Sequence, residues 1–97
     1  MLVTTRQTDF NEEKVLCYFG SMLTVQFTHT KQGNMHTFER THHQLAYIYP
    51  LHLSDCNAMV NTIFSKSYTA NDEELIYKAI ARDYNRLLQE VYRAIEK

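Results

Sequence analysis

Apolar and polar residues alternate through part of the first half of the chain, whereas apolar residues recur every three to four positions through the second half. Between residues 21 and 30 the regularly spaced apolar side chains are Leu23, Val25 and Phe27, with Thr and Gln between them. A period of two is typical of a strand that buries one face. The pattern therefore predicts strands over residues 21–30 and 35–42.

A turn at residues 31–34 is expected to join these two strands, because Gly33 and Asn34 tolerate positive φ. A turn centred on these four residues makes the numbers of facing residues sum to 65. The facing pairs are then Phe27 with Phe38 and His29 with His36. This register brings two imidazoles side by side across the hairpin.

Two neighbouring segments extend the expected sheet. Residues 44–49 are expected to form a further strand, after a bend near His42 and His43. Residues 14–19 fit two structures, and their β-branched and aromatic content favours a strand. The alternative is a short helix that Asp9 caps and that Gly20 would end.

The last third of the chain predicts one long helix within residues 69–97. Asn71 is the expected cap, and Glu74 follows three residues later, as in a capping box. The apolar positions at helical spacing are Ile76, Ile80, Tyr84, Leu87, Leu88, Val91 and Ile95. About 25 residues at 1.5 Å each give a helix of nearly 40 Å, which is long for so small a domain. Part of this helix is therefore expected to lack cover from its own chain.

A shorter helix is expected before it, over residues 54–67. Ser54 or Asp55 is the expected cap, shortly after Pro50. The apolar stripe of this helix consists of Cys56, Met59, Val60, Ile63 and Phe64. Residues 67–71 are expected to form the turn between the two helices.

These elements predict one α+β domain over residues 1–97. An antiparallel meander of three or four strands in the N-terminal half is covered on one face by two C-terminal helices, the last one long. The expected core consists of Leu16, Leu23, Val25, Phe27, Phe38, Ile48, Met59, Ile63, Ile76, Ile80, Leu87, Leu88 and Val91.

Composition narrows the classes of function. The formal net charge of −1 at pH 7 argues against a protein that binds duplex DNA through dense phosphate neutralisation. Cys17 and Cys56 are far apart and are expected to be reduced thiols. The chain starts without the pattern of a signal peptide and has no apolar run long enough to cross a bilayer. A cytoplasmic protein without membrane partners is the expectation.

The five histidines lie between His29 and His52, but they do not predict a metal site or a catalytic site. Two facing imidazoles are too few ligands for a structural zinc site. Cys17 lies in an apolar run and Cys56 lies on the apolar stripe of its expected helix, and thiols at such positions are usually inert packing groups. We therefore expect no enzyme activity, no metal and no cofactor.

Single-stranded nucleic acid is the alternative ligand. Proteins that bind it stack bases on aromatic side chains spread over a sheet, with basic groups around them. The candidate residues for this role are His29, His36, Arg40, Tyr47 and Tyr49. The basic content of the strands is low, however, so binding of this kind is expected to be weak.

Protein binding is the preferred hypothesis. Seven tyrosines and four methionines are many for 97 residues, and such side chains are enriched at interfaces. On the long helix, Tyr77, Tyr84 and Tyr92 recur at near-heptad spacing, and Arg82 and Arg86 lie beside them. The expected partner is another protein or a second copy of the chain. A small inhibitor or accessory protein of a phage or mobile element, directed for example at a nuclease defence system, would fit this description.

Overall fold

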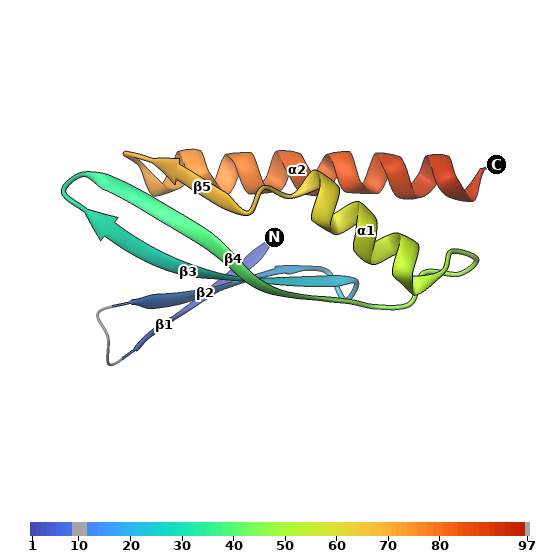
Figure 1. The fold of residues 1–97 in the computed structure, drawn as a ribbon, viewed down its shortest axis with the longest axis horizontal. Helices are drawn as coiled ribbons and strands as arrows, with labels where there is room; N and C mark the ends of the chain where they lie inside the picture. The colour runs from blue at the N-terminus through green and yellow to red at the C-terminus, as the bar shows by residue number, and fades with distance from the viewer. Residues whose placement is uncertain (9–11, 97) are drawn as a thin grey trace.

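The computed structural model describes residues 1–8 and 12–96. It contains one five-stranded antiparallel sheet and two helices, which confirms the α+β class (Figure 1). The elements are β1 (Leu2–Gln7), β2 (Glu13–Phe19), β3 (Leu23–Gln32), β4 (Met35–Leu45), α1 (Leu53–Ile63), β5 (Ser67–Ala70) and α2 (Glu73–Ile95). The strands follow one another in the sheet in sequence order. The expected number of three or four strands was too low.

The sequence pattern missed β1 and β5 for physical reasons. β1 is an edge strand whose residues after Val3 are polar and exposed, so it has no clear alternation. β5 has four residues, pairs with the first half of β4 and lies where only a turn between helices was expected. Segments this short carry too few residues to show a period.

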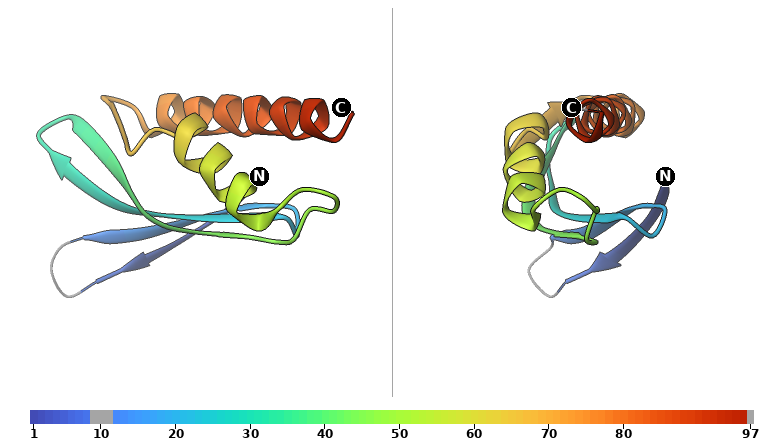
Figure 2. Two further views of the ribbon diagram at one scale, coloured as in Figure 1. Left: turned by 45° about the vertical axis from the view of Figure 1, so that its right-hand side comes forward. Right: turned by 90° about the vertical axis from the view of Figure 1, so that its right-hand side faces the viewer.

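Both helices cover the same face of the sheet (Figure 2). Because side chains alternate along a strand, every second side chain of β2 and β3 points toward the helices, and most of these side chains are buried in the core. The buried core consists of Val15, Cys17, Phe19, Leu23, Val25, Phe27, Phe38, Cys56, Val60, Phe64, Tyr68, Ile76, Ile80, Leu87 and Val91.

Five residues of the expected core are only partly buried. Ile48, Met59 and Ile63 still pack against the core, whereas Leu16 and Leu88 are placed differently. Leu16 lies between Val15 and Cys17, which are both buried, so it points to the face of the sheet that the helices leave open. Leu88 is only partly buried, because it follows the buried Leu87 around the helix toward its margin.

The hairpin of β3 and β4 has a different register from the expected one. Its turn contains only Gly33 and Asn34, so His29 faces Phe38 and Lys31 faces His36. This differs from the predicted pairing by two positions along the hairpin. Because side chains alternate with a period of two, such a shift leaves the residues between Phe27 and Arg40 on their expected faces.

The predicted strand over residues 44–49 was wrong. β4 continues to Leu45 without a break, and residues 46–52 form no regular structure. The irregularity expected near His42 is a bulge at Thr41, since Phe27 pairs with Arg40 and Gln26 pairs with His42, which leaves Thr41 without a partner position in β3.

The helix caps also differ from the expected ones. At the start of α2, Asp72 is the cap, and its side chain accepts a hydrogen bond of 3.0 Å from the backbone N–H of Glu74. Asn71 precedes the cap. α1 begins at Leu53 after His52, which makes no capping bond with its side chain.

The molecule is elongated, with extents of 47 × 23 × 20 Å. α2 follows the long axis for about 35 Å. One end of the molecule is formed by the turn between β3 and β4 (Figure 1). At the other end, the last turns of α2 extend beyond the turn between β2 and β3 and lie over residues 46–52. None of the described helices is long and apolar enough to cross a membrane.

Candidate protein-binding surface

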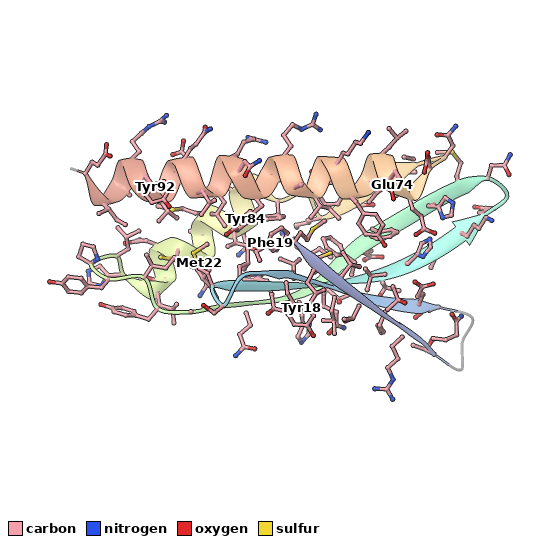
Figure 3. The ribbon with its side chains drawn as sticks, turned by 180° about the vertical axis from the view of Figure 1, so that it is seen from behind. Tyr18, Phe19, Met22, Glu74, Tyr84 and Tyr92 are labelled. Carbon is pink, nitrogen blue, oxygen red and sulfur yellow. The ribbon has the colours of Figure 1, made fainter. Side chains whose placement is uncertain are left out.

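The three tyrosines expected to bind a partner occupy different environments. Tyr77 packs edge-on against Phe38, with ring centroids 5.5 Å apart, and Tyr84 stacks on Phe19 at 4.2 Å (Figure 3). Burial raises the pKa of Tyr77 to about 12 and also raises the pKa of Tyr84. These two side chains therefore close the margin of the core, whereas Tyr92 is 61% exposed.

The two arginines expected beside them also differ in their contacts. Nη1 of Arg86 donates to Oδ1 of Asp83 at 3.2 Å, and Asp83 is a buried carboxylate that also accepts a hydrogen bond from the hydroxyl of Tyr68. Arg82 is exposed on the solvent side of α2. The predicted set of five residues thus does not form one continuous surface.

A different set of apolar side chains gathers at the end of the molecule where α2 extends beyond the sheet. Of the nine large hydrophobic residues that are exposed in the described chain, five come from residues 46–53 and from the last two turns of α2. We call these five residues the aromatic end; they are Tyr47, Tyr49, Leu53, Tyr92 and Ile95. Tyr49 is 80% exposed, and each of the five is at least 38% exposed.

Local packing explains why the tyrosines of residues 46–52 face outward. Ile48 and Leu51 pack against the core, and the backbone N–H of Leu51 donates to the carbonyl of Ile48 at 2.8 Å. The segment is also held at its start, where the N–H of Ala46 donates to the carbonyl of Met22 at 2.8 Å. With Ile48 directed inward, its neighbours Tyr47 and Tyr49 are left in solvent.

A groove of about 640 Å³ runs between α1 and the C-terminal half of α2. Its lining residues are Leu51, Asp55, Ala58, Met59, Thr62, Ile63, Arg86, Gln89, Glu90 and Ala94. We call this concavity the interhelical groove. The groove and the aromatic end draw on the same two segments, because Leu51 belongs to the segment that carries Tyr49 and Ala94 precedes Ile95 in α2.

The groove combines an apolar lining with charged residues of both signs. Met59 and Ile63 are half-buried and pack against the core, and small side chains at Ala58 and Ala94 leave room between the helices. Of the charged residues, Glu90 accepts a hydrogen bond at its Oε1 from Nη1 of Arg93, at 2.9 Å. An apolar centre with a polar surround is the usual composition of a protein interface.

The residues of the nucleic-acid alternative do not meet on one surface. His29 is buried, and Arg40 is held on the helix-covered side of β4 by a hydrogen bond of 3.0 Å from its Nη1 to Oδ1 of Asn61. Tyr47 and Tyr49 lie at the aromatic end, whereas His29 and His36 lie toward the turn between β3 and β4. Bases could not stack across all of these residues at once.

The two histidines meet although they are not directly opposite each other. Nε2 of His29 lies 2.8 Å from Nδ1 of His36, and the rings are stacked with centroids 5.0 Å apart. Oε1 of Glu73 lies 3.6 Å from Nδ1 of His36, and Oε2 of Glu13 lies 3.7 Å from Nδ1 of His29. Within residues 1–8 and 12–96, only His29, His36 and Glu73 bring three potential metal-ligand atoms within 4.8 Å of one another.

Sequence reasoning missed the two carboxylates in this cluster. Glu13 is brought to His29 by the pairing of β2 with β3, and Glu73 is placed by the first turn of α2. The shared face of His29 and His36 was visible in the alternation, but nothing in the spacing connects either carboxylate to them.

Both cysteines are free and buried. Burial raises the pKa of Cys17 to about 11, and it also raises the pKa of Cys56. Burial therefore favours the protonated form of both thiols, which is the less nucleophilic form.

Comparison of the chain with protein-family models, with curated proteins and with solved structures gives no match.

Proposed function

We propose that this chain is a non-enzymatic protein-binding module that acts by occupying a partner's surface. The contact surface consists of the interhelical groove and the adjoining aromatic end. The observation that carries the proposal is the gathering of exposed hydrophobic side chains from two distant segments at one end of the molecule, beside an apolar concavity.

Exposed apolar surface of this kind is costly to leave in water. Hydrophobic residues scattered singly over a surface need no explanation, but a contiguous group is typical of a binding site. Residues 45–51 contain no charged side chain, although they include Tyr47 and Tyr49. Tyrosine supplies a large contact area and keeps its hydroxyl available for hydrogen bonding, which is why it is enriched at interfaces.

The occupant that we propose is an amphipathic α-helix of a partner protein. A groove between two helices accepts the apolar side of a third helix. The small residues Ala58 and Ala94 allow close approach, and Met59 adapts its shape to an incoming side chain. Asp55 and Arg86 are placed to meet the polar margin of such a helix.

A single contact surface on a chain of 97 residues suits a protein that works by blocking or accompanying a larger one. We extend the proposal to an inhibitor or accessory protein of a phage or mobile element, for which a nuclease of a defence system is one such target.

Selection from a display library of helical peptides tests the proposed occupant. The enriched peptides are expected to carry apolar residues every three to four positions. Their affinity is expected to fall at least tenfold, equivalent to about 1.4 kcal/mol, for Ala58→Glu, which places a charge in the groove. The matched control is Asn85→Glu, which adds the same side chain to an exposed position of α2 outside the groove and leaves affinity unchanged.

Two results would contradict the proposal. One is equal binding of the selected peptides to Ala58→Glu and to the unmodified chain. The other is a stable homodimer in sedimentation experiments that Ala58→Glu dissociates, because the occupant would then be a second copy.

A further inference from the structure

We propose that His29, His36 and Glu73 bind one divalent transition-metal ion, Zn²⁺ in particular. This inference concerns the end of the molecule that is remote from the interhelical groove and does not depend on the proposed protein binding. It rests on the convergence of two imidazole nitrogens and a carboxylate oxygen from three different elements.

The fold itself brings the three ligands together. His29 lies on β3 and His36 lies on β4, two positions along from the residue that faces His29. Side chains related in this way share a face, and long or aromatic ones reach each other. Glu73 is the first residue of α2, which starts above this part of the sheet. His29 is buried, the His36 side chain is 14% exposed and the Glu73 side chain is 41% exposed, so the cluster lies at the edge of the core and opens to solvent at Glu73.

The donor atoms suit zinc. Neutral imidazole nitrogen and carboxylate oxygen are both established zinc ligands. With metal–nitrogen bonds of about 2.05 Å and tetrahedral angles, the two nitrogens must be about 3.3 Å apart. They are 2.8 Å apart, at hydrogen-bond distance, so binding requires a small rotation and replaces the shared proton with the ion. Three protein ligands leave the fourth position for water.

Glu13 supports this arrangement through Nδ1 of His29, the ring nitrogen that does not face His36. Its Oε2 lies 3.7 Å from Nδ1 of His29, which favours a proton on that nitrogen and leaves Nε2 unprotonated toward the metal position. Carboxylates that orient a ligating histidine in this way commonly tighten metal binding.

The charges around the site also favour a dication. Glu13 and Glu73 together carry the two negative charges that a divalent ion neutralises. The amino end of a helix is unfavourable for a cation, but Asp72 and Glu74 add negative charge at this end of α2. Lys31 faces His36 in the hairpin and is exposed, so it is the nearest competing cation in the strand register.

Calorimetric titration of the untagged, chelator-treated protein with Zn²⁺ tests the inference. We expect one equivalent to bind, together with a rise in the melting temperature that a chelator reverses. Titration with Co²⁺ is expected to produce visible absorption bands, which report coordination independently of heat.

Variants of His36 and Glu73 leave the buried His29 unchanged. His36→Gln and Glu73→Gln are each expected to weaken Zn²⁺ binding at least tenfold while far-UV circular dichroism stays unchanged. Glu13→Gln is expected to weaken binding by about 10–100-fold. His42→Gln is the matched control, because it removes an exposed histidine of the same strand and leaves binding unchanged. Absence of stoichiometric binding, or equal loss in the His42 and His36 variants, would overturn the inference.

Discussion

The two ends of this elongated molecule are built on opposite principles. At the end formed by the β3–β4 turn, polar side chains from four elements contact one another, and His29 is buried among them. At the aromatic end, large apolar side chains stand in solvent on a segment anchored by Ile48 and Leu51. Between them lies a core that buries one face of β2 from Val15 to Phe19 and one face of β3 from Leu23 to His29.

The two ends therefore differ in whether their side chains already have partners within the chain. The histidines, with Glu13 and Glu73, already have partners within the chain, so a ligand there must replace existing interactions. Tyr47 and Tyr49 form no such set, so a ligand at the aromatic end adds contacts and removes few. We therefore propose a small ion as the ligand at one end and a partner protein as the ligand at the other.

The largest effect is expected where neither end is involved. Leu87→Ala empties a buried position of α2 and is expected to lower the free energy of unfolding by about 2–5 kcal/mol, because a cavity remains beneath the helix. The adjacent Leu88→Ala changes the same side chain at a half-buried position and is expected to cost clearly less. Urea denaturation measures both, and equal losses would contradict the division between the buried and open sides of α2.

An intermediate effect is expected at the histidine end. His36→Ala removes the partner of the buried nitrogen of His29 and is expected to cost about 1–3 kcal/mol in metal-free protein. Thermal unfolding measures the loss. An unchanged free energy of unfolding would show that the contact between His29 and His36 does not stabilise the fold.

Alkaline pH is expected to destabilise the fold through groups that are buried in their neutral form. The pKa of Cys17 rises from an ordinary value of 9.0 to about 11 and that of Tyr77 from 10.0 to about 12, so the folded chain holds these protons more tightly than the unfolded chain. Their stabilising contribution is complete below pH 9 and is lost as pH rises through the folded values. Denaturation midpoints measured across this range should fall, and Tyr77→Phe should reduce the slope.

The smallest effect on stability is expected at the aromatic end. Tyr49→Ser and Tyr92→Ser remove exposed rings and are expected to change the free energy of unfolding by no more than about 0.5 kcal/mol. The same changes should reduce the fluorescence of a dye that binds exposed apolar surface. A large loss of stability would mean that these rings belong to the core of the fold.

The sequence was sufficient for the parts of the fold that have a long, regular period. The alternation in β3 and the helical spacing in α2 correctly identified both elements and most of their buried residues, such as Val25 and Ile80. The two-residue register error kept the side chains between Phe27 and Arg40 on their expected faces, which is why His29 and His36 still meet.

The remaining features depend on tertiary contacts that no local pattern contains. β1 and β5 form because a neighbouring strand offers hydrogen bonds, not because of their own alternation. Residues 46–52 have the composition of a strand, but they leave the sheet to close the core at the end of α2. The sequence predicted only that part of the long helix would lack contacts with the rest of the chain, and it did not identify the five residues of the aromatic end.

Chemical-shift mapping of the isotopically labelled protein with a selected helical peptide tests the central claim most directly. The account predicts that the largest amide shifts occur at residues lining the interhelical groove, such as Ala58 and Ala94, and at Tyr49, with little change at His29 and His36. Shifts concentrated on the open face of the sheet or at the histidine end would contradict it.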